Sequence, residues 1–95
     1  MTQELIKTST NNIPSIEQVQ DWLVSYMANI IEVAPNEVDI KMLFDEYGLD
    51  SSMVIGMIGD LEIWLGRDLD PTLVYDYSTI EDLSQHLGSV LKEGT

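Results

Sequence analysis

Hydrophobic residues recur at intervals of three and four along three segments of the chain, and no segment alternates with a period of two. Intervals of three and four place apolar side chains on one face of an α-helix. The first segment follows Ser15, which forms a capping-box pattern with Gln18, and Ala34-Pro35 is expected to stop this helix. The apolar face of this helix is predicted to hold Ile16, Val19, Leu23, Tyr26, Met27, Ile30 and Ile31.

A second helix is predicted to begin at Asp50 or Ser51 and to run to about Leu65. Gly66 is its expected C-terminal stop, because glycine readily adopts the left-handed conformation that ends helices. The buried stripe of this helix is expected to comprise Val54, Ile58, Leu61 and Leu65.

Two further helix start signals lie after residue 66. Asp70-Pro71 places a capping residue before a proline at the first helical position, which predicts a short helical turn at residues 72–75. Ser78 and Glu81 form another capping-box pattern, which predicts the start of the last helix. The apolar face of the last helix is predicted to hold Ile80, Leu83, Leu87, Val90 and Leu91.

A long connection, residues 36–50, joins the first two helices. A loop of this length in so small a domain is usually functional or carries its own packing anchors, and Phe44 and Leu49 are the candidates. The expected fold class is all-α, a small four-helix bundle of three longer helices and one short helix. Residues 1–14 are expected to form a flexible leader, residues 15–91 the helical domain and residues 92–95 a C-terminal tail.

Size and charge narrow the classes of function. The 95 residues suffice for one domain, and 44% of them are hydrophobic, which is enough to fold around a core. The formal net charge of −13 repels nucleic acid and anionic lipid surfaces and attracts basic protein surfaces, and the acids are densest in residues 35–50, just before Ser51. The longest apolar run, residues 53–59, is too short to span a bilayer, and the N-terminus does not resemble a secretory signal. We expect a cytoplasmic monomer with no nucleic-acid partner and no direct membrane insertion.

The sequence offers little for catalysis by its own side chains. There is no cysteine, and the one histidine, His86, is expected to face solvent on the last helix. The sequence contains no G-x-S-x-G elbow, no P-loop and no D-x-[DN]-x-[DN]-G calcium loop. The adjacent carboxylates Asp45 and Glu46 are expected to be solvated rather than to work as an acid–base pair. We therefore predict neither an enzyme nor a metal site.

One segment, residues 48–53 with the sequence GLDSSM, places a serine hydroxyl where a glycine-bearing loop enters a helix. The first turn of a helix has free backbone N–H groups and a partial positive charge, so a phosphate ester on Ser51 would be well placed there. From these residues alone, the alternative remains open that Asp50 and Ser51 only cap the helix.

This segment resembles the phosphopantetheine-attachment motif of acyl carrier proteins. The resemblance preserves order and spacing over about residues 15–91: Leu61-Glu62, PTLVYDY at residues 71–77 and TIEDL at residues 79–83 are similar to stretches of polyketide-synthase carrier domains. Aspartate before the serine is typical of acyl carriers rather than peptidyl carriers. The glycine-containing helix that follows, up to residue 66, resembles that of carriers paired with fatty-acyl-AMP ligases.

The resemblance implies that 4′-phosphopantetheine from coenzyme A is attached to Ser51, and that Asp50 orients the loop and presents charge to the modifying enzyme. It implies a carrier that tethers acyl intermediates as thioesters in polyketide or lipopeptide-type biosynthesis, with a fatty-acyl starter unit. The implied partners are a phosphopantetheinyl transferase, a fatty-acyl-AMP ligase or acyltransferase, a ketosynthase and an acyl-modifying enzyme such as a desaturase. The alternatives are a carrier for ordinary fatty-acid synthesis and an unmodified acidic helical adaptor. The core residues that a folded-back acyl chain would contact are Val54, Ile58, Leu61, Tyr75 and Leu83.

The chain departs from the family pattern at Ser52, where leucine or methionine is usual, and alignment with the motif assigns the modification to Ser51. Gly56 and Gly59 each cost the helix about 1 kcal/mol relative to alanine, and they line up with Ser52 opposite the buried stripe. This face is expected either to dock a partner, with the acids as a steering rim, or to receive a neighbouring loop of the same domain. The candidate docking residues are Ser52, Met53, Ile55, Gly56, Gly59, Asp60, Glu62, Asp45 and Glu46.

Overall fold

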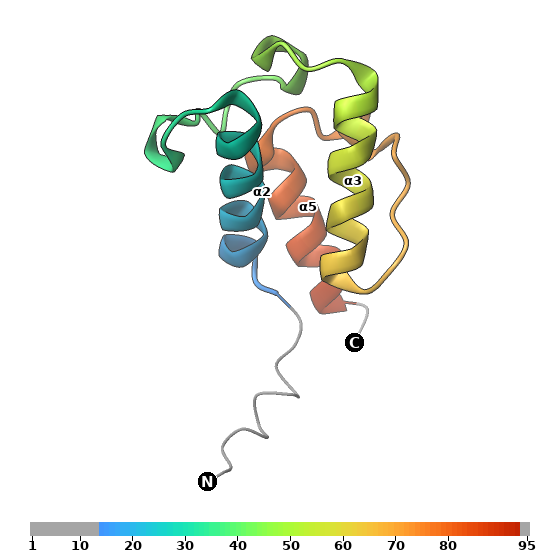
Figure 1. The fold of residues 1–95 in the computed structure, drawn as a ribbon. Helices are drawn as coiled ribbons and strands as arrows, with labels where there is room; N and C mark the ends of the chain where they lie inside the picture. The colour runs from blue at the N-terminus through green and yellow to red at the C-terminus, as the bar shows by residue number, and fades with distance from the viewer. Residues whose placement is uncertain (1–13, 94–95) are drawn as a thin grey trace, which may run out of the picture.

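Three longer helices lie side by side in the computed structural model, which describes residues 14–93 (Figure 1). They are α2 (Ile16–Ile31), α3 (Ser51–Leu65) and α5 (Ile80–Glu93), and the short α4 (Leu73–Asp76) lies between α3 and α5 in the chain. α2 runs opposite to α3 and α5, and residues 32–50 cross one end of the bundle. The predicted class, a small bundle of three longer helices and one short helix, is confirmed.

The predicted domain limits at residues 14 and 91 stay a prediction. Of the leader expected at residues 1–14, all but Pro14 lies outside the described residues. α5 extends to Glu93, past the predicted domain end at residue 91. Between residues 14 and 93, no helix is both long enough and apolar enough to cross a membrane.

Local hydrogen bonds explain why the helices start and stop where they do. The Ser15 hydroxyl accepts from the Gln18 N–H at 3.1 Å, and the Gln18 side chain accepts from the Ser15 N–H at 2.9 Å, so the predicted capping box forms. Gly66 ends α3 with a left-handed φ of 74°, as predicted. Asp70 accepts from the Thr72 N–H at 3.0 Å and caps a turn that precedes α4, which therefore begins one residue later than predicted.

The end of α2 differs from the prediction: the helix stops at Ile31, before Ala34-Pro35. Glu32 adopts a left-handed φ of 63°, and the N–H groups of Glu32 and Val33 both donate to the carbonyl of Ala28. Proline explains the early stop. It has no N–H to give to the carbonyl of Ile31, and it disfavours helical geometry in the residue before it, so the chain leaves the helix a turn earlier.

The N-cap of α5 is Thr79 rather than Ser78, which the sequence predicted. The Thr79 hydroxyl accepts from the Asp82 N–H at 3.1 Å, whereas the Ser78 hydroxyl donates to the Tyr75 carbonyl at 3.2 Å. The Ser78 carbonyl is occupied by the N–H of Phe44 at 2.9 Å, which holds Ser78 in extended pairing with the long connection. A contact with a distant segment therefore moves the helix start by one residue.

The core lies where α2, α3 and α5 meet, and the long connection contributes Phe44 to it. Phe44 is confirmed as an anchor, and Leu49 packs half-buried against the core. Met57 is fully buried although the predicted stripe of α3 omitted it, and Val90 is 41% exposed because it lies about 100° around α5 from Leu91. The buried apolar residues are Val19, Leu23, Met27, Ala28, Phe44, Met57, Ile58, Leu61, Val74, Ile80, Leu83, Leu87 and Leu91.

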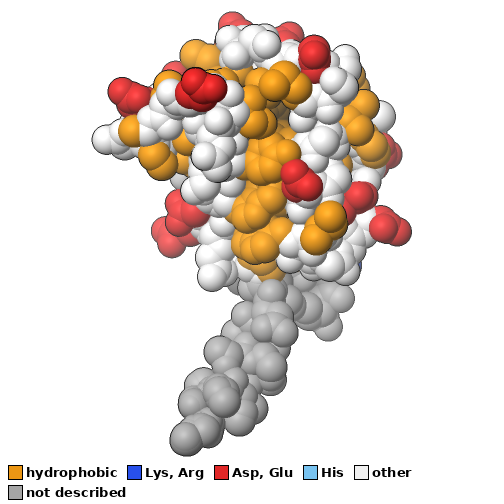
Figure 2. Space-filling view, in the orientation of Figure 1, with side chains coloured by type: hydrophobic (Ala, Val, Ile, Leu, Met, Phe, Trp, Pro, Cys, Tyr) orange, Lys and Arg blue, Asp and Glu red, His pale blue; other side chains and the backbone are white. Residues whose placement is uncertain are grey.

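α2 meets its two neighbours in different ways. Along α5 the backbones approach closely at Gly88, where an added Cβ would lie 2.9 Å from the Cα of Ile16 and closer still to its side chain. Toward α3 the seam is aromatic, because Trp22 stacks on Tyr26 with ring centroids 5.1 Å apart and across to Trp64 at 5.6 Å. Figure 2 shows a band of hydrophobic side chains between α2 and α3.

Replacing Gly88 by alanine should therefore destabilise the fold, although alanine is the better helix former. The new methyl group collides with the Ile16 backbone, and overpacking of this kind costs about 1–3 kcal/mol. Gly56→Ala is the matched control: nothing lies within 4 Å of its added Cβ, so it should raise the free energy of unfolding by up to about 1 kcal/mol. Urea unfolding measures both, and equal stabilisation by the two substitutions would contradict the close approach at Gly88.

Candidate functional site

Ser51 is the first residue of α3, and the preceding connection is tied to the start of α5. The Phe44 N–H donates to the Ser78 carbonyl at 2.9 Å, and the Glu81 N–H donates to the Ile40 carbonyl at 3.0 Å. Leu43 pairs with Thr79 in an isolated antiparallel bridge. We call these contacts, between residues 40–44 and residues 78–81, the connection–α5 bridge. This bridge holds the chain against one end of the bundle a few residues before Ser51.

The chain then turns sharply into α3. The 3₁₀ helix η2 (Phe44–Tyr47) ends at Gly48, whose φ of 84° is left-handed and favours glycine. Asp50 is the N-cap of α3, with extended backbone, and its carboxylate accepts from the Met53 N–H at 2.9 Å. The predicted helix start at Asp50-Ser51 is therefore confirmed, and the capping role falls to Asp50.

The two adjacent serines have different surroundings. The Ser52 hydroxyl donates to Oδ1 of Asp50 at 2.9 Å, so it is already engaged. The Ser51 hydroxyl is exposed and makes no hydrogen bond to any residue between 14 and 93. The Met53 N–H, and after it the Ser52 hydroxyl, hold the pKa of Asp50 below its usual range, so this carboxylate is ionised at neutral pH. An ionised carboxylate thus lies next to a free hydroxyl.

A cavity of about 430 Å³ opens beside Ser51, between η2, the start of α3 and the α4 region. Its lining residues are Leu43, Phe44, Asp45, Leu49, Asp50, Ser51, Val54, Ile55, Pro71, Thr72, Val74, Tyr75 and Ser78. Of the residues expected to contact an acyl chain, Val54 and Tyr75 line this cavity. Ile58, Leu61 and Leu83 are fully buried in the core instead. Tyr75 was predicted to be core, which is wrong: it is 75% exposed at the cavity wall.

The outer face of α3 is smooth and partly apolar. Apart from neighbouring residues of the same helix, nothing between residues 14 and 93 lies within 4 Å of a Cβ added at Gly56 or Gly59, so no described loop packs against these two positions. Ser52 and Met53 are exposed, Ile55 is 55% exposed and Ile63, next to the glycines on the wheel, is 81% exposed.

The predicted acidic rim is less free than the sequence suggested. On α3, Oδ2 of Asp60 accepts from the Tyr26 hydroxyl at 2.6 Å, and Oε2 of Glu62 accepts from the Leu69 N–H at 2.7 Å. Glu46 accepts from the Leu43 N–H at 3.2 Å. These three carboxylates brace the chain, while Asp45 is exposed at the cavity.

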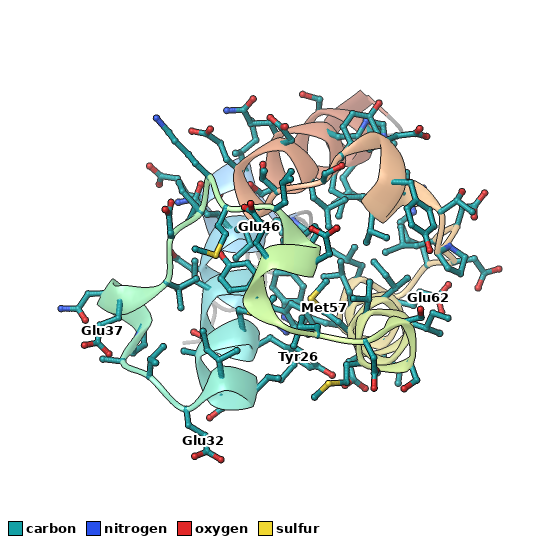
Figure 3. The ribbon with its side chains drawn as sticks, turned by 90° about the horizontal axis from the view of Figure 1, so that it is seen from above. Tyr26, Glu32, Glu37, Glu46, Met57 and Glu62 are labelled. Carbon is teal, nitrogen blue, oxygen red and sulfur yellow. The ribbon has the colours of Figure 1, made fainter. Side chains whose placement is uncertain are left out.

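Other acids are directed away from α3. Figure 3 shows Glu32 and Glu37 pointing outward at the far side of the bundle, whereas Met57 turns inward between the helices. His86 is half-buried and stacks on Tyr77 with ring centroids 4.0 Å apart, so its predicted solvent-facing position is wrong. The described His, Asp and Glu side chains form no group of three or more that could hold a metal ion.

Comparison with known proteins places this geometry among carriers. The family model described as "Phosphopantetheine attachment site" matches residues 21–87. The chain is 34% identical, over 77% of its length and 84% of the relative's, to the acyl carrier protein TtuC of Teredinibacter turnerae. It is also 30% identical over 85% of its length to the polyketide synthase PksL of Bacillus subtilis, of which it spans only 2%.

Solved structures agree on the fold. The solution structure of an acyl carrier protein from Anabaena sp. PCC 7120 with a variant phosphopantetheinylation-site sequence is similar with a TM-score of 0.78 and 39% identity, covering 81% of this chain and 88% of that one. A free-standing peptidyl carrier protein from an Acinetobacter baumannii secondary metabolic pathway is similar with a TM-score of 0.74 and 34% identity, covering 81% and 96%.

The bond between Tyr26 and Asp60 makes a pH-dependent prediction about the α2–α3 seam. Hydrogen bonding to Asp60, then burial, then the charge of that carboxylate raise the pKa of Tyr26 to about 12. Because this pKa is raised, the bond stabilises the fold below the ordinary tyrosine pKa of 10.0, and its contribution is lost as the pH rises through about 12. Asp60→Asn should lower the pKa of Tyr26 in an NMR titration, whereas Asp45→Asn should leave it unchanged. An unchanged Tyr26 titration in Asp60→Asn would contradict the bond.

Proposed function

The chain belongs to the phosphopantetheine-attachment family of carrier proteins, and we propose that it carries acyl intermediates as thioesters on a 4′-phosphopantetheine arm attached to Ser51. Members of this family bear the arm as a covalent group and act as carriers rather than as catalysts. The arm supplies the thiol that the cysteine-free chain lacks.

The environment of Ser51 is the observation that carries the proposal. Its hydroxyl is exposed and not hydrogen-bonded within the described chain, while the hydroxyl of Ser52 is held by Asp50. Ser51 also begins α3, where the helix dipole and unpaired N–H groups favour the negative charge of a phosphodiester. The cavity beside it leaves room for the part of the arm nearest the serine. The residues present therefore fit the group, and they favour Ser51 over Ser52.

The relatives support a role in polyketide or related secondary metabolism. They include an acyl carrier protein and polyketide synthases, and the similar structures include a carrier of a secondary metabolic pathway. We propose a fatty-acyl starter unit delivered by a fatty-acyl-AMP ligase or acyltransferase, passage to a ketosynthase, and processing by a modifying enzyme such as a desaturase. A tethered substrate reaches these partners at high effective concentration.

The cavity supports a further part of this proposal, contact with the acyl chain. Val54, Ile55 and Val74 give its wall apolar side chains, and Tyr75 lies exposed at its edge. Apolar surface of this kind favours an aliphatic chain over water. We propose that the segment of substrate nearest the thioester rests here, rather than among the fully buried core residues Ile58, Leu61 and Leu83.

The outer face of α3 is the proposed docking surface. Ser52, Met53, Ile55 and Gly56 are exposed and Gly59 is half-buried, and together they offer low-relief contact area beside Ser51. Exposed Asp45 is the proposed steering charge nearest to the cavity. We keep Asp60, Glu62 and Glu46 in the proposed rim, although a partner must compete with their bonds inside the chain.

Incubation with coenzyme A and a promiscuous phosphopantetheinyl transferase tests the attachment. The wild-type protein should gain the mass of one arm, because the Ser51 hydroxyl is free to attack the pantetheine-side phosphorus of coenzyme A, which breaks the pyrophosphate bond and releases adenosine 3′,5′-bisphosphate. Ser51→Ala should gain none, and Ser52→Ala should still gain one. Absence of a gain in the wild type, or a gain that survives Ser51→Ala, would favour the unmodified adaptor or the other serine.

Substitution of the helix glycines tests docking. Gly56→Gln and Gly59→Gln fill the smooth face without touching the core, so the folded variants should be loaded and should pass on acyl groups about tenfold more slowly, which corresponds to about 1.4 kcal/mol. Ser89→Gln, on the exposed side of α5, is the matched control and should behave as wild type. Wild-type rates for both glycine variants would overturn the docking proposal while leaving the attachment at Ser51 intact.

A further inference from the structure

Two aspartates in this chain hold a hydroxyl two residues further on. Oδ1 of Asp50 accepts from the Ser52 hydroxyl at 2.9 Å and from the Met53 N–H at 2.9 Å. Oδ1 of Asp70 accepts from the Thr72 hydroxyl at 2.8 Å and from the Thr72 N–H at 3.0 Å. The arrangement thus occurs twice, once directly at Ser51 and once before α4.

The Ser52 bond is not needed to cap α3. The Met53 N–H already satisfies the capping role of Asp50, and the Ser52 hydroxyl donates to a carboxylate rather than serving an unpaired backbone group. Both side chains are exposed, where a hydrogen bond of this kind adds little to folding stability. Folding stability therefore does not explain why residue 52 carries a hydroxyl.

The bond does restrict the orientation of the Asp50 carboxylate. Two donors converge on Oδ1, so rotation of the carboxylate would break both bonds. The Ser52 N–H also interacts with this carboxylate, whereas neither the Ser52 hydroxyl nor the Met53 N–H donates to Oδ2, which belongs to an exposed side chain. One oxygen is thus fixed against the helix, and the other is left for a partner.

We propose that Ser52 is a positioning residue for the modification of Ser51: its hydroxyl fixes the Asp50 carboxylate so that Oδ2 is presented to a positively charged group of the transferase. The proposal rests on the attachment of the arm to Ser51. A charge held in one orientation loses less conformational freedom when a partner binds, and this lowers the cost of forming the complex. The same bond keeps the Ser52 hydroxyl engaged, which separates the roles of two adjacent serines.

Steady-state transfer from coenzyme A to the intact chain tests this role. Loss of a hydrogen bond to a charged group should raise the KM of the transferase for Ser52→Ala about fivefold, with kcat within about twofold of wild type. Ser52→Thr, which keeps the hydroxyl, should restore the wild-type KM. Ser89→Ala removes an exposed hydroxyl on α5 and should leave the KM unchanged.

Two further readouts separate positioning from a structural effect. In an Asp50→Asn background, adding Ser52→Ala should change the KM no further, because Ser52 acts through the carboxylate. By NMR titration, the pKa of Asp50 should rise in Ser52→Ala and stay low in Ser89→Ala. Urea unfolding at neutral pH should show Ser52→Ala less stable by no more than the equivalent of that pKa rise.

The outcomes distinguish the two proposals. If the wild type is loaded and Ser52→Ala has the wild-type KM, or if its defect persists in the Asp50→Asn background, the positioning role is overturned and the attachment stands. An equal defect in Ser89→Ala shows a general effect of losing a surface hydroxyl and also overturns it. A wild type that accepts no arm overturns the proposed function, and the positioning role with it.

Discussion

The placement of Ser51 depends on the connection–α5 bridge. Residues 32–50 would otherwise be a long loop with many possible paths, and their conformational entropy would oppose any single position for the residues that follow. Backbone bonds to the start of α5 and the buried ring of Phe44 fix this path. The left-handed turn at Gly48 then aims the chain into α3, so the cavity, the Asp50 cap and the free hydroxyl all take their geometry from one set of contacts between distant segments.

The negative charge of the chain is divided between two tasks. The formal net charge of −13 gives the whole molecule an attraction for basic surfaces, and this attraction weakens with salt. Both carboxylates of α3, however, accept hydrogen bonds from other segments, so much of the charge on this helix secures its packing. The face beside Ser51 is consequently more apolar than the composition suggests, with Asp50 as the carboxylate immediately before the serine.

Sequence predicted those features that local chemistry determines. The limits of α3 follow from Asp50 and Gly66, which act through their own neighbours, and the motif alone led to Ser51 as the proposed attachment residue. Features that join distant segments were missed. The N-cap of α5 lies one residue later than predicted because the N–H of Phe44 donates to the carbonyl of Ser78. Asp60 accepts a hydrogen bond from Tyr26, which is 34 residues away in the sequence. The cavity could not be predicted because two stretches that are distant in the sequence, within residues 43–55 and 71–78, build its wall together.

The uncovered glycines of α3 have a consequence for the dynamics of the domain. A helix that contains two of them has a low intrinsic tendency to stay folded, so Met57, Ile58 and Leu61 must hold it in place from one side only. We therefore expect α3 to open locally more readily than a helix of the same length without such glycines, on the timescale that amide hydrogen exchange records. A protein that covers this face would suppress the opening as it binds. Recognition of the carrier and the ordering of α3 would then be coupled in a single equilibrium.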